Sequence, residues 1–357
     1  MPEYLFVDQP DTIIENLACH DELGVDTEFV REKTFFAQLC LVQISTPNRI
    51  YCVDPLTDND QDQYWRALLA SRWVVHSARQ DIEVVLQTAG AMPTEIFDTQ
   101  VAAGLLGFPA QMGYAGLVKE LFDVDMAKTH TRADWTRRPL PEEFLQYAAE
   151  DVEYLLPAGE ILTERLDKAG RLDWAKQDSM LLLDPALYDI TGDQAVKRLK
   201  GARNFRGQKR AAAVRLALWR ESEAIRRNRP RQWIIRDNVL LDVAYNLPTS
   251  ESQLAGIDGM PSKLINRVGK QLLDEVAASS GDDDDYQPPK PPNEAQKALL
   301  KEMQAQVATC AKDLGLAAET VASKRELSAA IASGSRESRV FTGWRRDLIG
   351  EQLVSLL

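Results

Sequence analysis

The chain has 357 residues, which predicts two or three independent cores at roughly 150 residues per domain. Hydrophobic residues make up 45% and charged residues 27% of it, which excludes wholesale disorder, and no apolar run approaches the ~20 residues of a membrane span. The net charge of −12 argues, as an average, against a polyphosphate partner.

The first 170 or so residues alternate short runs typical of β-strands with helical patterns. Branched and aromatic residues between turn signals predict strands over 23–29, 35–45, 49–55, 73–78 and 94–100. Apolar residues at helical spacing predict helices over 62–70, 78–90, 99–107, 114–122 and 141–170. This alternation indicates an α/β domain with a central sheet flanked by helices.

From about residue 195 onward the pattern is helical throughout. A segment with four consecutive Asp and four Pro, too polar and Pro-rich to fold, reads as a linker. The predicted organisation is an α/β domain over 1–195, a helical domain over 196–279, a linker over 280–293 and a second helical domain over 294–357.

Two carboxylates lie two residues apart on the first predicted strand. Successive strand residues face opposite sides, so Asp26 and Glu28 share one face, whereas Thr27 lies on the other. Two acids next to a sheet core repel each other unless a cation neutralises them, and hard oxygen ligands select Mg²⁺ or Mn²⁺. The alternative is a solvated edge strand carrying harmless charges.

Further candidate groups follow along the chain. Asp81 falls in the first turn of the helix after the strand 73–78, where an acid is also favoured by the helix dipole alone. Tyr147 and Asp151 lie four residues apart and therefore share a helix face. A phenol and a carboxylate in this arrangement suit one site, although a tyrosine is often just a half-buried amphipathic side chain.

Together these elements resemble a known family. The segments VDTEF, HSARQD, FDTQ and YAAEDVEYL look like the motifs of DEDD-superfamily exonucleases, in the subclass whose third motif is YxxxD. DTEFVREKTFFAQLCLVQIS and DWTRRPL extend the resemblance to ribonuclease D enzymes. The segments ARNFRGQKRAAAVRLALWRESEAIRRNRP and NVLLDVAYNLP resemble a first HRDC domain, and FTGWRRDLIGEQLVSLL fits the end of a second one less specifically.

The resemblance implies a ribonuclease-H-like exonuclease domain followed by two all-α HRDC-like domains. It also implies a 3′-5′ exoribonuclease that uses two divalent cations, Mg²⁺ or Mn²⁺. The implied metal ligands are Asp26, Glu28, Asp81 and Asp151, and Tyr147 is the motif tyrosine. All five are present, so the family pattern is complete.

The expected substrate is RNA with a single-stranded 3′ end, such as precursor tRNA and other small structured RNAs, cleaved to 5′-mononucleotides. A DNA 3′-5′ exonuclease is the nearest alternative, weakened because the sequence lacks the G-x-x-x-x-G-K-[ST] loop of an attached motor. A non-catalytic RNA-binding scaffold of the same fold predicts missing carboxylates, and none is missing.

Three polar residues near these motifs have plainer interpretations. Asp98 precedes a predicted helix and is best explained as its N-cap, with a metal-ligand role in reserve. Asp54 precedes a proline at a turn, where Asp bonds the local backbone. His76 closes a strand and either contacts the scissile phosphate or satisfies a backbone carbonyl.

Candidate RNA contacts fall in two basic segments. In the first, Lys128 and Arg132 precede Trp135, which either stacks on RNA or fills the core. Residues 197–236 hold 14 Lys and Arg against two Glu, a local charge of +12 that leaves −24 for the remainder. Such a patch suits phosphates, although a charge run is often only a solvated helix face; its candidates are Arg203, Arg206, Lys209, Arg210, Arg226, Arg227, Arg229 and Arg231.

Cellular location and assembly have weaker signals. The N-terminal residues lack the basic and apolar regions of a leader peptide. The four cysteines are scattered without a paired spacing, which suggests neither a disulfide framework nor a zinc site. We therefore expect a cytoplasmic protein without membrane contact, and, in the absence of a ring-forming pattern, a monomer.

Overall fold

The computed structural model describes residues 2–57, 60–126, 133–189, 192–282 and 291–357. These residues form two compact units. The first unit comprises 1–30, 38–187 and 291–357, and the second comprises 31–37 and 188–290. Within the described ranges, no helix is both long and apolar enough to span a bilayer.

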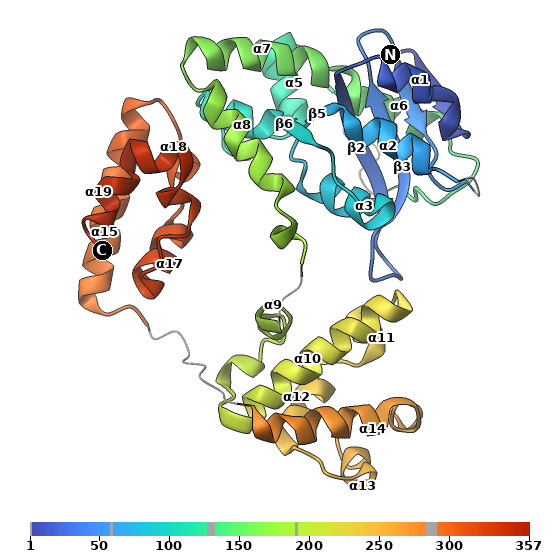
Figure 1. Ribbon diagram of the computed structural model, residues 1–357, viewed down its shortest axis with the longest axis vertical. Helices are drawn as coiled ribbons and strands as arrows, with labels where there is room; N and C mark the ends of the chain where they lie inside the picture. Colours follow the sequence, from blue (N-terminus) through green and yellow to red (C-terminus); the bar gives the residue numbers. More distant parts are fainter. Residues whose placement is uncertain (1, 58–59, 127–132, 190–191, 283–290) are drawn as a thin grey trace. The chain divides into compact units, whose positions relative to one another are not determined.

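A six-stranded mixed sheet forms the centre of the first unit (Figure 1). Its order is β1-β4-β3-β2-β5-β6. The strands are β1 (Tyr4–Val7), β2 (Glu22–Val30), β3 (Gln38–Ser45), β4 (Ile50–Val53), β5 (Arg72–Val75) and β6 (Glu95–Asp98). Strand β2 pairs antiparallel with β3 and parallel with β5, so it lies inside the sheet and its face positions are held by neighbours on both sides.

Helices pack on this sheet. They are α1 (Ile14–Ala18), α2 (Asp62–Ala70), α3 (Arg79–Ala89), α4 (Thr99–Leu105), α5 (Tyr114–Phe122), α6 (Glu142–Glu153), α7 (Leu155–Lys168) and α8 (Leu172–Met180). Helix α6 contacts β1 to β4, and α7 contacts β2 and β5. The buried core includes Leu41, Val74, Phe97, Ala148 and Leu162. The predicted fold of a mixed sheet flanked by helices is therefore confirmed.

Strand β1 was missed by the sequence pattern. It has four residues, of which Leu5 and Phe6 are exposed, so the alternation of apolar and polar residues that marks a strand is lacking. Its position at the edge of the sheet comes from parallel pairing with β4, which no local signal encodes.

The C-terminal region of the first unit is helical. It contains α15 (Glu294–Asp313), α16 (Ala318–Val321), α17 (Lys324–Ser333), α18 (Gly343–Arg345) and α19 (Glu351–Val354). Capping boxes begin α15 at Asn293 and α17 at Ser323. In the second of these, burial disfavours the charge of Glu326, but hydrogen bonds from Arg339 and Ser323 outweigh it and lower its pKa.

This region docks on α8 through a buried ion pair. The Arg345 guanidinium, 2% exposed, donates to both carboxylate oxygens of Asp178 at 2.6 Å each. The ring of Trp344 stacks on Trp174 with centroids 4.3 Å apart and also donates to Asp178. The C-terminal helices and the sheet domain are thereby joined through one charged and aromatic cluster.

The second unit is a helical bundle. It contains α9 (Gly192–Lys197), α10 (Gly207–Arg227), α11 (Arg231–Ile234), α12 (Asp237–Asn246), α13 (Glu251–Ala255) and α14 (Ser262–Ala278). The segment 31–37 belongs to it: Phe35 is 4% exposed within its core, and the Asn228 side chain accepts the N–H groups of Phe35 and Phe36. The strand predicted over 35–45 accordingly begins at Gln38.

Candidate active site

Strand β2 carries the first two candidate ligands. Asp26 is paired with Gln43 and Glu28 with Leu41 on β3, and an irregularity follows Glu28. Both side chains are partly exposed, whereas Thr27 between them is buried. The pleat of a strand thus places the two carboxylates on one face, as the spacing predicts.

Gly24 permits a close approach two residues before Asp26. A Cβ atom there would lie 2.1 Å from the Ser45 Oγ atom and 3.0 Å from the Leu155 Cβ atom. Any larger residue would push α7 or β3 away from β2. This glycine therefore helps to hold the helical layer that carries Asp151 close to the strand.

Asp81 lies where β5 gives way to α3. The pairing of β5 with β2 ends at Val74 and Gly24. Beyond this point the chain turns, and the first turn of α3 lies beside the residues of β2 that follow Gly24. There the Thr27 hydroxyl donates to the Asp81 carboxylate at 2.5 Å, with both residues buried. The sequence patterns did not indicate this role of Thr27.

Helix α6 supplies the tyrosine and the last carboxylate. Tyr147 and Asp151, four residues apart, are linked by a hydrogen bond from the phenol to the carboxylate. Burial is the main cause that raises the pKa of Tyr147, and the charge of Asp151 adds to it. The ring of Trp135 packs 6.3 Å from the Tyr147 ring and supports its position.

The carboxyl groups affect one another's pKa, although burial is the larger cause of each shift. Burial raises the pKa of Glu28 to about 9, with additions from the charges of Asp26, Asp151 and Asp81. Burial, then the charge of Asp151, raises the pKa of Asp26 to about 8. The pKa of Asp81 is raised by burial and by Asp26. Residues from β2, α3 and α6 therefore form one acidic cluster, and the charges that act on it are mainly those of its own members.

This cluster fits a divalent cation in its donor chemistry. Carboxylate oxygens are preferred ligands of Mg²⁺ and Mn²⁺, and a cation would relieve their mutual repulsion. In the part of the chain that the structure describes, however, no three His, Cys, Asp or Glu side chains form a ready-made metal cage. Asp81, for example, is engaged by Thr27, so its carboxylate would have to turn to reach an ion.

Neighbouring polar residues have structural partners. The Asp98 carboxylate accepts the N–H groups of Ser77, Ala78, Gln100 and Val101, which caps α4 and holds the start of α3. The N-cap interpretation thus accounts for this side chain.

His76 and Asp54 are also engaged. The two ring nitrogens of His76 lie 2.9 Å from the Thr99 hydroxyl and the Met112 carbonyl oxygen. Asp54 accepts the N–H of Leu56 at 2.9 Å, the local backbone bond expected of an Asp at a turn, and also two hydrogen bonds from the Arg138 guanidinium. Both arrangements match the structural interpretation rather than substrate contact.

A second tyrosine, Tyr114, lies near the acidic cluster, although the sequence patterns did not indicate it. Tyr114 accepts the N–H of Tyr154 and packs against His76, with ring centroids 5.7 Å apart. Burial raises the pKa of Tyr114. The hydrogen bond with Tyr154 opposes this rise, and the charges of Asp151 and Asp26 add to it. A single tyrosine at the start of a helix carries no motif, which is why the sequence did not reveal it.

Of the three candidates in the first basic segment, the structure describes only Trp135. Trp135 is 3% exposed and packs against Phe144 and Tyr147, so it fills the core. Lys128 and Arg132, predicted to contact RNA, lie outside the described residues.

Ion pairs within the second unit engage many cations of the basic run. Arg226 and Arg227 pair with Glu223, and Arg231 pairs with Glu221. These ion pairs engage three of the eight candidate arginines and lysines, although the run keeps its net charge of +12, which already counts both glutamates.

The remaining candidates of the run differ in accessibility. Arg210 is 5% exposed, too buried to meet a phosphate directly. The Lys209 ammonium lies 3.4 Å from the centre of the Tyr245 ring. Arg203, Arg206 and Arg229 are exposed, and the Arg206 guanidinium donates to the Arg203 and Phe205 carbonyl oxygens.

Comparisons with known proteins agree with this geometry. A family model of 3′-5′ exonucleases matches residues 7–167, and a model of the HRDC domain matches residues 209–276. Ribonuclease D of Gluconacetobacter diazotrophicus is 35% identical over 96% of this chain and 89% of its own length. The chain belongs to the ribonuclease D family. Ribonuclease D of Pseudomonas paraeruginosa is similarly close, at 34% identity over 94% of this chain and 92% of its own length.

A solved structure supports the same assignment. Escherichia coli RNase D, described as an exoribonuclease involved in structured RNA processing, superposes with a TM-score of 0.87 at 27% identity over 99% of this chain and 98% of that chain. The prediction of a 3′-5′ exoribonuclease is thus confirmed. Exonucleases of this family depend on divalent metal ions, and the ribonuclease D members act on RNA.

Proposed function

We propose that this exoribonuclease trims the single-stranded 3′ ends of precursor tRNA and other small structured RNAs, releasing 5′-mononucleotides. Two Mg²⁺ or Mn²⁺ ions would be held by Asp26, Glu28, Asp81 and Asp151. The observation that carries the proposal is the placement of these carboxylates on β2 and on α3 and α6, the two helices that contact this strand.

The cations, when bound, supply a nucleophilic water at neutral pH and stabilise charge on the leaving 3′ oxygen. Asp26 and Glu28 on β2, Asp81 at the start of α3 and Asp151 on α6 would hold the ions. Asp81 would have to release the Thr27 hydroxyl to take part.

Tyr147 is assigned to orient the attacking water. Its raised pKa keeps the phenol protonated at neutral pH, so it does not act as a base. With its O–H donated to Asp151, the phenol oxygen can accept a directional hydrogen bond from that water. Its contribution is therefore positional.

The substrate assignment draws support from the family, because the E. coli relative is described as acting in structured RNA processing. Helical domains over 196–279 and 294–357 would hold the folded body of the RNA while the domain over 1–195 degrades its end. A monomer in the cytoplasm remains our expectation for this activity.

The direct test is degradation of a 3′-tailed tRNA and of a DNA of matched sequence, with Mg²⁺, with Mn²⁺ and with EDTA. We expect metal-dependent shortening of the RNA from its 3′ end to 5′-mononucleotides, and loss of activity in Asp26→Ala and Asp151→Ala. Glu143→Gln is the matched control, because Glu143 is an exposed acid on the same helix as Asp151. Activity in EDTA, or normal activity of Asp26→Ala, would contradict the mechanism, and preference for the DNA would contradict the substrate.

A further inference from the structure

The second unit contains a cavity of about 420 Å³ whose lining residues include none of the active-site candidates. It is formed by α11, the start of α12, the turn before α14 and the first turns of α14. Gly259 in that turn has a φ of +73°, and a Cβ there would approach Val239 to 3.3 Å, so a glycine closes this wall. The volume lies within the range of about 300–1,000 Å³ usual for small-ligand pockets.

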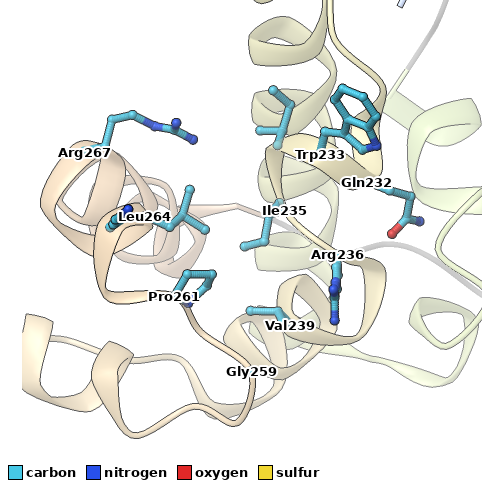
Figure 2. Close-up of a pocket in the computed structure, with 11 residues that line it drawn as sticks. Gln232, Trp233, Ile235, Arg236, Val239, Gly259, Pro261, Leu264 and Arg267 are labelled. Atoms are coloured by element: carbon cyan, nitrogen blue, oxygen red, sulfur yellow. The ribbon is translucent and has the colours of Figure 1, made fainter. Parts of the chain in front are cut away.

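The cavity has an apolar floor and a cationic rim. Figure 2 shows Ile235 and Leu264 pointing toward each other across it, with Pro261 and Val239 beneath. The cations come from both walls: Arg236 precedes α12, and Lys263 and Arg267 lie on α14. All three are exposed, and Figure 2 shows Arg267 reaching from α14 over the floor.

These three cations differ from the paired arginines of the basic run 197–236, to which Arg236 itself belongs. Among the residues that the structure describes, the side chains of Arg236, Lys263 and Arg267 make no hydrogen bond or ion pair, whereas Arg226, Arg227 and Arg231 are paired with glutamates.

No acid is present among the described residues that line the cavity. The nearby Asp237 is committed to the buried Arg220, at 2.5 Å. Three positive charges therefore converge on one concave site without a protein counter-ion.

An exposed aromatic ring stands beside these charges. Trp233 is 58% exposed, although tryptophan normally buries most of its surface. Its ring projects beside the cavity, away from Leu264 (Figure 2), and the Arg229 guanidinium lies 5.9 Å from the ring centre. An exposed ring next to unpaired cations is the combination with which proteins bind single-stranded nucleic acids.

We propose that this cavity binds an unpaired nucleotide of single-stranded RNA. The base would enter between Ile235 and Leu264, the adjoining phosphates would bind Arg236, Lys263 and Arg267, and the next base would stack on Trp233. The inference rests on the RNA substrate of the enzyme and gives the helical unit a defined contact point. An apolar peptide would fit the floor of the cavity equally well, but it would leave the three unpaired cations of the rim without a binding partner.

The test measures binding of a 5′-labelled oligoadenylate to the full-length protein by fluorescence anisotropy in EDTA, where the RNA is not degraded. Trp233→Ala should weaken binding by about 5- to 150-fold, the equivalent of one stacked base, and Trp233→Phe should restore most of it. Lys263→Gln and Arg267→Gln should each weaken binding and reduce the slope of log K against log salt by about one.

Lys200→Gln is the matched control, because Lys200 is an exposed cation of the same unit that does not line the cavity. Its affinity and salt slope should stay within twofold of the parent protein. Unchanged affinity in Trp233→Ala, equal losses in Lys200→Gln and Lys263→Gln, or no binding by the parent protein would each overturn the proposal. Failure of RNA hydrolysis with Mg²⁺, in contrast, would count against the proposed active site and leave this cavity standing.

Discussion

The Arg345–Asp178 pair offers the sharpest test of what holds the C-terminal helices on the sheet domain. We predict that Arg345→Met destabilises the protein severely. The replacement removes two hydrogen bonds of 2.6 Å to Asp178 and others to the Val321 and Thr320 carbonyl oxygens. It leaves the Asp178 carboxylate buried, with 9% of its side chain exposed and no cation beside it.

The magnitude follows from this burial. Breaking a buried ion pair by removing one partner costs about 3–5 kcal/mol, because the remaining charge stays desolvated. The adjacent Arg346 provides the contrast. It is 62% exposed and lies 3.5 Å from a Glu351 that is 71% exposed, so Arg346→Met should cost less than about 1 kcal/mol.

Urea unfolding at pH 7, followed by tryptophan fluorescence because Trp174 and Trp344 stack at this contact, measures both variants. Adding Asp178→Asn to Arg345→Met should recover part of the loss, since the unpaired charge disappears. Equal free energies of unfolding for Arg345→Met and Arg346→Met would refute the reasoning.

Three further predictions concern the active site and its support. Tyr147→Phe should lower the single-turnover rate severalfold with little change in metal affinity, because it deletes a hydrogen bond and no ligand; a normal rate would contradict the water-orienting role. Gly24→Ala should cost about 1–3 kcal/mol by overpacking against Ser45, whereas Gly281→Ala, where a Cβ meets nothing within 4 Å, should be neutral in thermal unfolding. Glu326 has a lowered pKa, so its stabilisation is present above its unfolded pKa of about 4.3 and is lost as the pH falls through its folded value. Glu326→Gln should therefore cost about 1 kcal/mol at pH 7 and progressively less as the pH falls below about 4, and a loss that stays constant in acid would argue against linkage.

Much of the catalytic domain could be predicted because its signals are local. Strand β2 and helix α6 have clear periodicities, so the shared faces of Asp26 with Glu28 and of Tyr147 with Asp151 follow from residue spacing. Asp98 likewise precedes a helix whose first N–H groups it accepts. Local patterns could not predict the Thr27–Asp81 contact, because it depends on where β5 stops pairing with β2.

The basic run shows the limit of composition. Its charge of +12 is a property of 197–236 alone, and it does not reveal which cations the two glutamates engage. In three dimensions each of Glu221 and Glu223 meets two arginines. The unpaired cations instead come partly from α14, outside the run, where Lys263 and Arg267 gave no signal by their spacing.

The assignment of 31–37 to the second compact unit affects how the helical unit can be studied. The chain leaves the sheet domain after Val30, places Phe35 in a helical core and returns at Gln38. A protein shortened at Leu187 would keep Phe35 but lose the residues that enclose it, exposing an aromatic ring within seven residues of Glu28. Deletion would thus disturb the strand that carries Asp26 and Glu28 as well as remove the proposed RNA contacts, so single substitutions on the helical surface are the cleaner way to separate the two roles.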